Sequence, residues 1–306
     1  MLLEYLSNTL LLEKSYIADI ADTASQRYKL FHVKKKSGGQ RTILHPAREL
    51  KALQRVIHDD ILNSLPLHES AFAYRKNISL LNHAKVHAGG SFVLRMDFSN
   101  FFESILRDDV VIFVEQNKSL MGDGWCSEDT ELFTKLVCFG NSLTIGSVTS
   151  PSLSNVMCYG LDEKLKKLSY AHDVKYSRYA DDLYFSTHRP NVLRKIQLEV
   201  VKIVRQISLP SNLSINTSKT HHTSRKKKMA VTGLTLTTDG SVSIGREMKR
   251  KLRAMIFSWE KLNGKEKKFL VGYLSFCSSV EPEFINSLCR KYGAELITKI
   301  QRSILK

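Results

Sequence analysis

The chain has 306 residues, of which 42% are hydrophobic and 25% are charged, and these values are ordinary for a globular protein. The charge balance is unusual, because 46 lysines and arginines against 30 acidic residues leave a formal net charge of +16. This excess predicts a polyanionic partner. We expect nucleic acid and not a membrane, since no apolar run is long enough to span a bilayer.

The cysteines and the first residues of the chain indicate where in the cell the protein is expected. Five cysteines, an odd number without a CxxC pair, favour reduced thiols over a disulfide framework or a zinc site. The leucine-rich start has neither a basic region nor a small-residue cleavage site, so no signal peptide is expected. A cytoplasmic location is predicted.

The first elements expected along the chain are a helical region and a basic hairpin. Apolar residues recur at helical spacing over residues 1–30, and a strand pattern over 28–33 is followed by a second strand over 42–44. Three lysines, Gly38-Gly39 and Arg41 lie between or beside these strands. Such a turn is either simply solvated or a clamp for a triphosphate, because arginine makes bidentate phosphate contacts and lysine supplies a point charge.

A pair of histidines follows an amphipathic helix that is expected over residues 47–65. His83 and His87 have the i, i+4 spacing on a short helix that some zinc sites use. No glutamate follows the first histidine and no third ligand is near in the sequence. We therefore do not expect zinc here.

Asp97 ends a predicted strand over residues 91–96, where a carboxylate is either a metal ligand or the cap of a following helix. Residues 108–139 have a helical pattern with a break at 121–124. The loop over 146–155, rich in small residues, then leads into another helix. Small residues let a backbone approach a ligand closely, although a serine-rich helix cap explains the same composition.

Asp181 and Asp182 are adjacent and have strand-forming residues on both sides, which predicts a β-hairpin with the acidic pair at its tip. Neighbouring like charges are unfavourable unless a positive charge lies near them. Mg²⁺ would supply that charge, because it prefers hard oxygen ligands. A solvated acidic turn is the alternative, and the pair by itself does not decide between them.

The remaining chain is predicted as a helix over 191–207, a strand over 213–216 that ends near Lys219, a strand over 230–236, and helices over 245–306. Two clusters in this part are strongly basic. They contain Arg225, Lys226, Lys227 and Lys228, and then Lys249, Arg250, Lys251 and Arg253.

Taken in chain order, Asp97, the loop over 146–155 and the Tyr179-Ala180-Asp181-Asp182 hairpin resemble the palm of a reverse transcriptase. Over nearly its whole length the chain is most similar to bacterial retron reverse transcriptases. The segments that carry this second resemblance are the basic hairpin with Pro46–Lys51, His83-Ala84-x-x-His87, Val231-Thr232-Gly233 and Ile244–Glu247.

The resemblance implies an α+β fold of the right-hand polymerase type. It places fingers over residues 1–91, a palm over 92–243 with a helical insertion shared with the fingers, and a thumb over 244–306. It implies a retron RNA-directed DNA polymerase that makes branched multicopy single-stranded DNA (msDNA) from its own non-coding RNA, using dNTPs. An effector protein and a role in antiphage defence are implied as well.

The resemblance also assigns residues to roles. Two Mg²⁺ ions, which Mn²⁺ can replace, are held by Asp97, Asp181, Asp182 and the carbonyl of Phe98. The nucleotide is contacted by Lys35, Lys36, Arg41, Phe102, Gly146 and Lys219, with Phe102 excluding a 2′-hydroxyl and Lys219 near the leaving pyrophosphate. RNA is contacted by His83, His87, Val231, Thr232, Gly233, Arg225, Lys226, Lys227, Lys249 and Arg250.

Two positions depart from the family pattern. Ile145 stands where the family usually has glutamine before Gly146, which removes a side chain near the nucleotide. His83 stands where the retron segment usually has asparagine, and histidine keeps the ability to donate and accept hydrogen bonds.

Two other functions are alternatives to a retron polymerase. One is a nucleic-acid-binding scaffold that restrains an effector, and the other is a group II intron or diversity-generating reverse transcriptase.

Overall fold

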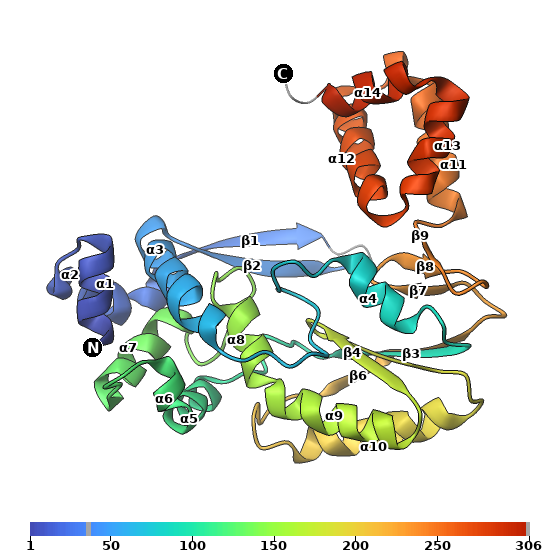
Figure 1. Ribbon diagram of the computed structural model, residues 1–306. Coiled ribbons are helices and arrows are strands. Elements are labelled where there is room, and N and C mark those ends of the chain that lie inside the picture. Colours follow the sequence, from blue (N-terminus) through green and yellow to red (C-terminus); the bar gives the residue numbers. More distant parts are fainter. Residues whose placement is uncertain (35–37, 304–306) are drawn as a thin grey trace. The chain divides into compact units, whose positions relative to one another are not determined.

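The computed structural model describes residues 1–34 and 38–303 (Figure 1). The chain forms two compact units that are interleaved along the sequence. The first unit contains Met1–Lys76, Leu94–Phe185 and Asn191–His221, and the second contains Asn77–Val93, Ser186–Pro190 and His222–Lys306. The expected division into consecutive fingers, palm and thumb stays a prediction.

The first unit begins with helices whose apolar faces are buried against one another, as the 3–4 spacing of Leu2, Leu6, Leu50 and Leu53 requires. They are α1 (Leu2–Leu10), α2 (Lys14–Asp22), η1 (Ala24–Gln26), α3 (Arg48–Val56), η2 (Ile57–Ile61), η3 (Leu62–Ser64), α5 (Arg107–Gln116), α6 (Lys118–Met121) and α7 (Ser127–Val137). The helical region expected over 1–30 is interrupted, because Leu11 adopts a left-handed φ of 54° that ends α1.

The expected basic hairpin consists of β1 (Tyr28–Lys34) and β2 (Gln40–Pro46), which pair antiparallel with Val33 opposite Arg41. The amide of Leu44 on β2 donates to the carbonyl oxygen of Ile145 at 2.8 Å. This bond attaches the hairpin to the loop that begins α8.

A four-stranded sheet, most of which belongs to the first unit, has the order β4-β5-β3-β6. Its strands are β3 (Phe92–Phe98), β4 (Lys175–Tyr179), β5 (Asp182–Thr187) and β6 (Ile215–Ser224). The associated helices are α8 (Ser150–Met157), α9 (Tyr159–Ala171) and α10 (Val192–Gln206). Helices α9 and α10 lie side by side along the sheet (Figure 1), and α10 buries a stripe of four apolar residues, Leu193, Ile196, Val200 and Val204.

The second unit has a small antiparallel sheet, β7 (Met229–Val231), β8 (Leu234–Leu236) and β9 (Val242–Ser243), against which α4 (Leu80–His87) packs. The single strand expected over 230–236 is wrong. Thr232 and Gly233 adopt φ values of 45° and 86°, so the chain reverses there in the two-residue turn that joins hairpin strands.

Helices form the rest of the second unit, as predicted for residues after 245. They are α11 (Arg246–Phe257), η4 (Trp259–Lys261), α12 (Gly264–Val280), α13 (Pro282–Tyr292) and α14 (Ala294–Arg302). None of the helices within 1–34 and 38–303 is both long enough and apolar enough to cross a membrane.

Candidate active site

Three aspartates gather where the β4–β5 hairpin meets the end of β3. Asp97 is the penultimate residue of β3, Asp181 lies in the turn after β4, and Asp182 is the first residue of β5. The amide of Phe98 donates to the carbonyl oxygen of Asp181 at 3.1 Å, which holds the turn beside β3. The hairpin that the sequence pattern predicts is present, and the sheet brings the distant Asp97 to it.

The electrostatics of this cluster follow from burial and from like charges. The pKa of the Asp181 carboxyl is raised by burial and then by the charge of Asp97. The pKa of Asp182 is raised to about 6, chiefly by burial; Arg95 opposes this rise, and the charges of Asp181 and Asp97 add to it. The charge of Asp97 therefore lies close enough to Asp181 and Asp182 to oppose their ionisation.

Two basic side chains contact the aspartates directly. Lys219 on β6 places its Nζ 2.7 Å from Oδ1 of Asp97. Arg95 on β3 donates from Nε to Oδ1 of Asp182 at 3.0 Å and from Nη2 to Oδ2 at 2.9 Å. Both cations are about half exposed, at 56% and 48% of the side chain.

A divalent cation suits this donor set, because hard carboxylate oxygens are the ligands that Mg²⁺ prefers and a cation would relieve the mutual repulsion. In the part of the chain that the structure describes, no group of three or more His, Cys, Asp or Glu side chains is arranged as a ready metal site. Lys219 and Arg95 engage two of the three carboxylates, and the metal roles of Asp97, Phe98, Asp181 and Asp182 stay predictions.

The described residues that are expected at the nucleotide lie on four segments, which are β2, the turn after β3, the loop before α8 and β6. Arg41 on β2 is near enough for its charge to lower the pKa of Asp181 against the stronger effects that raise it. Phe102, which follows β3, is half-buried, whereas Phe101 beside it is 4% exposed and stacks on Phe98 with ring centroids 5.5 Å apart. Phe101 is thus the core aromatic of this pair. Lys35 and Lys36 lie outside the described residues.

Gly146 lies close to the basic hairpin. A Cβ at Gly146 would be 2.4 Å from the carbonyl oxygen of Leu44, and φ at Gly146 is 110°, so only glycine fits without strain. The close contact between this loop and β2 therefore requires a glycine at position 146. A direct contact of Gly146 with the nucleotide stays a prediction.

Tyr74 and Arg95 are two residues near the aspartates that the sequence reasoning missed. The pKa of Tyr74 is raised by burial and by the charge of Asp181, although 48% of the residue is exposed. No local pattern singles out Tyr74. Arg95 could have been found, because side chains two apart on a strand share a face and Asp97 is two residues later.

The segments expected to contact RNA meet in the second unit. His83 and His87 on α4 are fully buried. Nδ1 of His87 lies 2.8 Å from Oγ of Ser186, and Nδ1 of His83 lies 3.4 Å from Oγ1 of Thr232 in the β7–β8 turn. Val231 is also fully buried. The fold brings these residues together, and their direct contact with RNA stays a prediction. His83, His87 and Val231 are buried, whereas Thr232 is half-buried and Gly233 is exposed.

The basic residues expected to contact RNA divide into two groups. The Arg225 guanidinium donates to the carbonyl oxygens of Ala88, Gly89 and Gly90, each at 3.1 Å, and to carbonyls of the β8–β9 connection. Lys249 pairs with Glu281, which lies between α12 and α13. Both cations therefore have structural partners. The exposed members are Lys226, Lys227 and Arg250.

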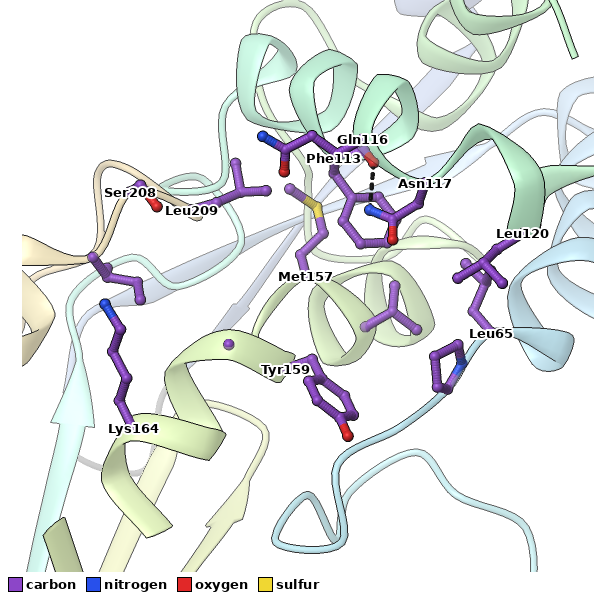
Figure 2. Close-up of a pocket in the computed structure, with 14 residues that line it drawn as sticks. Leu65, Phe113, Gln116, Asn117, Leu120, Met157, Tyr159, Lys164, Ser208 and Leu209 are labelled. Atoms are coloured by element: carbon purple, nitrogen blue, oxygen red, sulfur yellow. Dashed lines mark hydrogen bonds between the residues drawn. The ribbon is translucent and has the colours of Figure 1, made fainter. Parts of the chain in front are cut away.

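The first unit also contains a mainly apolar cavity of about 560 Å³ (Figure 2). Phe113 and Met157 point into it, and Tyr159 and Lys164 lie at its lower side in the view. None of the predicted catalytic or nucleotide-binding residues lines this cavity.

Comparison with known proteins adds an independent observation. Residues 33–236 match the family described as reverse transcriptase (RNA-dependent DNA polymerase). Retron Ec83 reverse transcriptase of Escherichia coli is 30% identical over 290 residues, covering 90% of each chain. Retron Ec86 reverse transcriptase of the same organism is 33% identical over 288 residues, covering 90% of this chain and 86% of the relative.

A more distant relative and one solved structure extend the comparison. Retron Mx162 reverse transcriptase of Myxococcus xanthus is 28% identical over 294 residues, covering 85% of this chain and 59% of the relative. The structure of telomerase from Candida albicans aligns with a TM-score of 0.50 at 14% identity, over 94% of this chain and 58% of that chain. At this identity the structural likeness concerns the fold alone.

Proposed function

The chain belongs to the reverse transcriptases, and within them to the bacterial retron enzymes, and from this premise we propose that it copies its own non-coding RNA into branched msDNA at the three aspartates. RNA-directed DNA polymerase activity follows from the family, with an RNA template and dNTPs as substrates. Beyond this activity, the proposal specifies a branched product, divalent metal ions, the residues that hold them and bind the substrates, and a cytoplasmic location.

The gathering of Asp97, Asp181 and Asp182 is the observation that carries the proposal. Asp97 precedes Asp181 by more than 80 positions, yet the β3–β5 pairing and the bond from Phe98 to Asp181 bring it within electrostatic range of the other two carboxylates. The three side chains and the Phe98 carbonyl would hold two Mg²⁺ ions or their Mn²⁺ substitutes. When bound, such ions stabilise the attacking and leaving oxygens of phosphoryl transfer.

The surrounding residues would bind and orient the nucleotide. Arg41 supplies a fork of donors for triphosphate oxygens, and Lys219 supplies a mobile charge that can exchange Asp97 for the leaving pyrophosphate. Phe102 keeps part of its ring accessible beside the buried Phe101, and a ring in that position leaves no room for a 2′-hydroxyl. Gly146 lets the loop approach β2 closely and keeps these segments together.

The cognate RNA would be held by phosphate contacts and selected by the second unit. Lys226, Lys227 and Arg250 are exposed and suit phosphate contacts. The Thr232-Gly233 turn, with His83 behind it, is the candidate for selecting which RNA is bound, since phosphate contacts position an RNA without reading it. We also propose an effector protein and a role in antiphage defence, supported by the similarity to retron enzymes alone.

Primer extension on the co-purified RNA tests the catalytic part. Asp181→Asn is expected to abolish DNA synthesis, whereas Asp123→Asn, which changes an exposed carboxylate between α6 and α7, is expected to leave it unchanged. Synthesis by Asp181→Asn at the wild-type rate would refute the assignment. If that variant still binds the RNA and the wild type makes no DNA, the scaffold alternative is favoured.

A salt titration tests the RNA-binding part. Replacing Lys226, Lys227 and Arg250 by glutamine is expected to weaken RNA binding and to reduce the slope of log affinity against log salt by about 0.7–0.9 for each lost phosphate contact. Lys14→Gln, a change in an exposed cation that pairs with Glu4, is the control. An unchanged slope in the triple variant would contradict the assignment.

A further inference from the structure

A fully buried ion pair lies beside the catalytic turn and has no role in the mechanism above. Arg178 on β4 and Asp162 on α9 are both 0% exposed in their side chains. Nη2 of Arg178 is 2.7 Å from Oδ2 of Asp162, and Nε is 2.9 Å from Oδ1, so the contact is bidentate. A buried pair of this kind adds little net stability, because loss of hydration offsets the attraction between the charges. Stability alone therefore does not account for it.

The remaining nitrogen of Arg178 is directed at the turn itself. Nη1 donates to the carbonyl oxygen of Ala180 at 3.2 Å and to Oδ1 of Asn155 at 3.0 Å. Ala180 immediately precedes Asp181 and has a φ of 55°, in the left-handed region that residues other than glycine occupy only when their surroundings hold them. The guanidinium thus binds the carbonyl of Ala180, the strained residue that sets the direction in which the chain enters Asp181 and Asp182.

The partners of Arg178 are themselves fixed. Asp162 accepts a further bond from the hydroxyl of Tyr176 at 2.7 Å, and Nδ2 of Asn155 donates to the carbonyl oxygen of Ala73 at 2.7 Å. The amide of Arg178 donates to the carbonyl oxygen of Ser70 at 2.7 Å. The guanidinium therefore connects α8 and α9 to the turn that contains Ala180 and Asp181, and Asn155 and the Arg178 amide connect the same network to residues 70–73.

We propose that Arg178 is a positioning residue for catalysis. Asp162 and Asn155 orient its guanidinium, the guanidinium fixes the Ala180 carbonyl, and the turn so fixed aims the carboxylates of Asp181 and Asp182 at the divalent cation. The inference rests on the proposed function of these aspartates. The inference goes beyond that function because it assigns the orientation of the two carboxylates to a buried guanidinium that contacts neither metal nor substrate.

Arg178→Lys tests the proposal, because lysine keeps a positive charge opposite Asp162 but cannot reproduce a planar fork that reaches acceptor oxygens of three residues. Mn²⁺ binding to the nucleic-acid-free protein, measured by electron paramagnetic resonance titration, is expected to weaken about 10-fold or more. The Mg²⁺ concentration for half-maximal primer extension should rise by a similar factor, and the KM for dNTP should change by less than about threefold. These readouts separate positioning from loss of folded protein.

Asp109→Asn is the matched control. Asp109 is also a buried carboxylate of the first unit, and it accepts bonds from the amides of Leu106 and Ser211 at 3.1 Å each. This control is expected to lower the melting temperature while leaving both metal constants at the wild-type value. Wild-type metal constants in Arg178→Lys, or equal changes in Asp109→Asn, would overturn the proposal.

A second variant covers the case in which Arg178→Lys does not fold. Asn155→Ala leaves the ion pair intact and removes one of the groups that orient it, so Mn²⁺ binding should weaken about threefold or more in a protein with the wild-type circular dichroism spectrum. Unchanged binding there overturns the proposal. A wild-type protein that neither binds Mn²⁺ nor extends a primer contradicts the proposed function instead, so the two failures are distinguishable.

Discussion

Asp182→Asn should make the protein more stable in the absence of metal while it abolishes DNA synthesis. Asp182 has a pKa of about 6 in the folded protein against an ordinary value of 3.8, chiefly because it is buried. A carboxyl whose pKa is raised by folding stabilises the folded state below its unfolded pKa, and this contribution is lost as the pH rises through the folded value. At pH 7 the ionised Asp182 is therefore destabilising.

The size of the effect follows from the pKa difference. A difference of about two pKa units corresponds to roughly 3 kcal/mol, since each unit is about 1.4 kcal/mol. This figure already contains the opposing effect of Arg95, whose 48% exposed side chain contributes at most about 1 kcal/mol. We expect a net gain of about 2–3 kcal/mol at pH 7, or about 4–10 °C in melting temperature for a unit of this size.

Differential scanning calorimetry in EDTA measures this gain. The difference between Asp182→Asn and the wild type should be largest at pH 7–8 and should disappear near pH 4, where the wild-type carboxyl is protonated. Adding Mg²⁺ should stabilise the wild type more than the variant, because ligand binding to the folded state raises its stability. Asp123→Asn, with its exposed carboxylate, should show no such pH dependence.

Two results would refute this reasoning. A variant that is less stable than the wild type at pH 7 in EDTA would mean that the Arg95 contact outweighs the cost of burying the charge. A gain of the same size at pH 4 and pH 8 would mean that the stabilisation has a cause other than the ionisation of Asp182.

Three further predictions concern the nucleotide, the loop and the second unit. Phe102→Ala should raise incorporation of ribonucleotides relative to dNTPs by about tenfold or more, which competition extension assays measure; unchanged selectivity would make Phe102 a packing residue. Gly146→Ala should lower the rate of extension at least about tenfold, because the added Cβ would lie 2.4 Å from a carbonyl oxygen of β2. Gly160→Ala is the control and should be neutral, because a Cβ there meets nothing within 4 Å. Burial lowers the pKa of His83 to about 4. Up to about 3 kcal/mol of stability is therefore present above pH 6.5 and is lost as the pH falls towards 4. Calorimetry of His83→Asn in the Asp182→Asn background should show that this loss is absent.

The elements with a strong local pattern were predictable from the sequence. The basic hairpin, the helical segments after residue 107 and the β4–β5 hairpin with Asp181 and Asp182 at its tip are all present. The break at Leu11 was not predictable, because leucine is not a residue type that usually ends a helix. The turn at Thr232-Gly233 carried one local signal, because a glycine inside a strand pattern favours a turn. Leu11 is 90% exposed, and its positive φ belongs to the left-handed cap of α1, where its amide donates to the carbonyl oxygen of Ser7. Thr232 has a positive φ in the hairpin turn, where its Oγ1 lies 3.4 Å from Nδ1 of the distant His83, and single-residue propensities do not report such a contact.

The partners of the charged residues were predictable only in part. Lys219 and Asp97 are 122 positions apart, and their proximity was implied by family resemblance and not by spacing. The basic clusters favoured a nucleic-acid partner, and this stays a prediction for the individual residues. Within the clusters, Arg225 and Lys249 have partners in the fold, whereas Lys226 and Arg250 are exposed. A run of like charges does not tell which members face solvent, because that depends on carbonyls and carboxylates from distant segments.

The charges around the aspartates suggest a division of labour between exchangeable and fixed cations. Lys219 and Arg95 contact carboxylates directly and are about half exposed, so water can replace their contacts at little cost when a metal or a phosphate competes. Arg178 is fully buried and acts on the backbone of the turn, so nothing in solution can replace it. On the proposed function, the direction of Asp181 and Asp182 would be independent of which cation neutralises them, and the same turn would serve during each cycle of nucleotide addition.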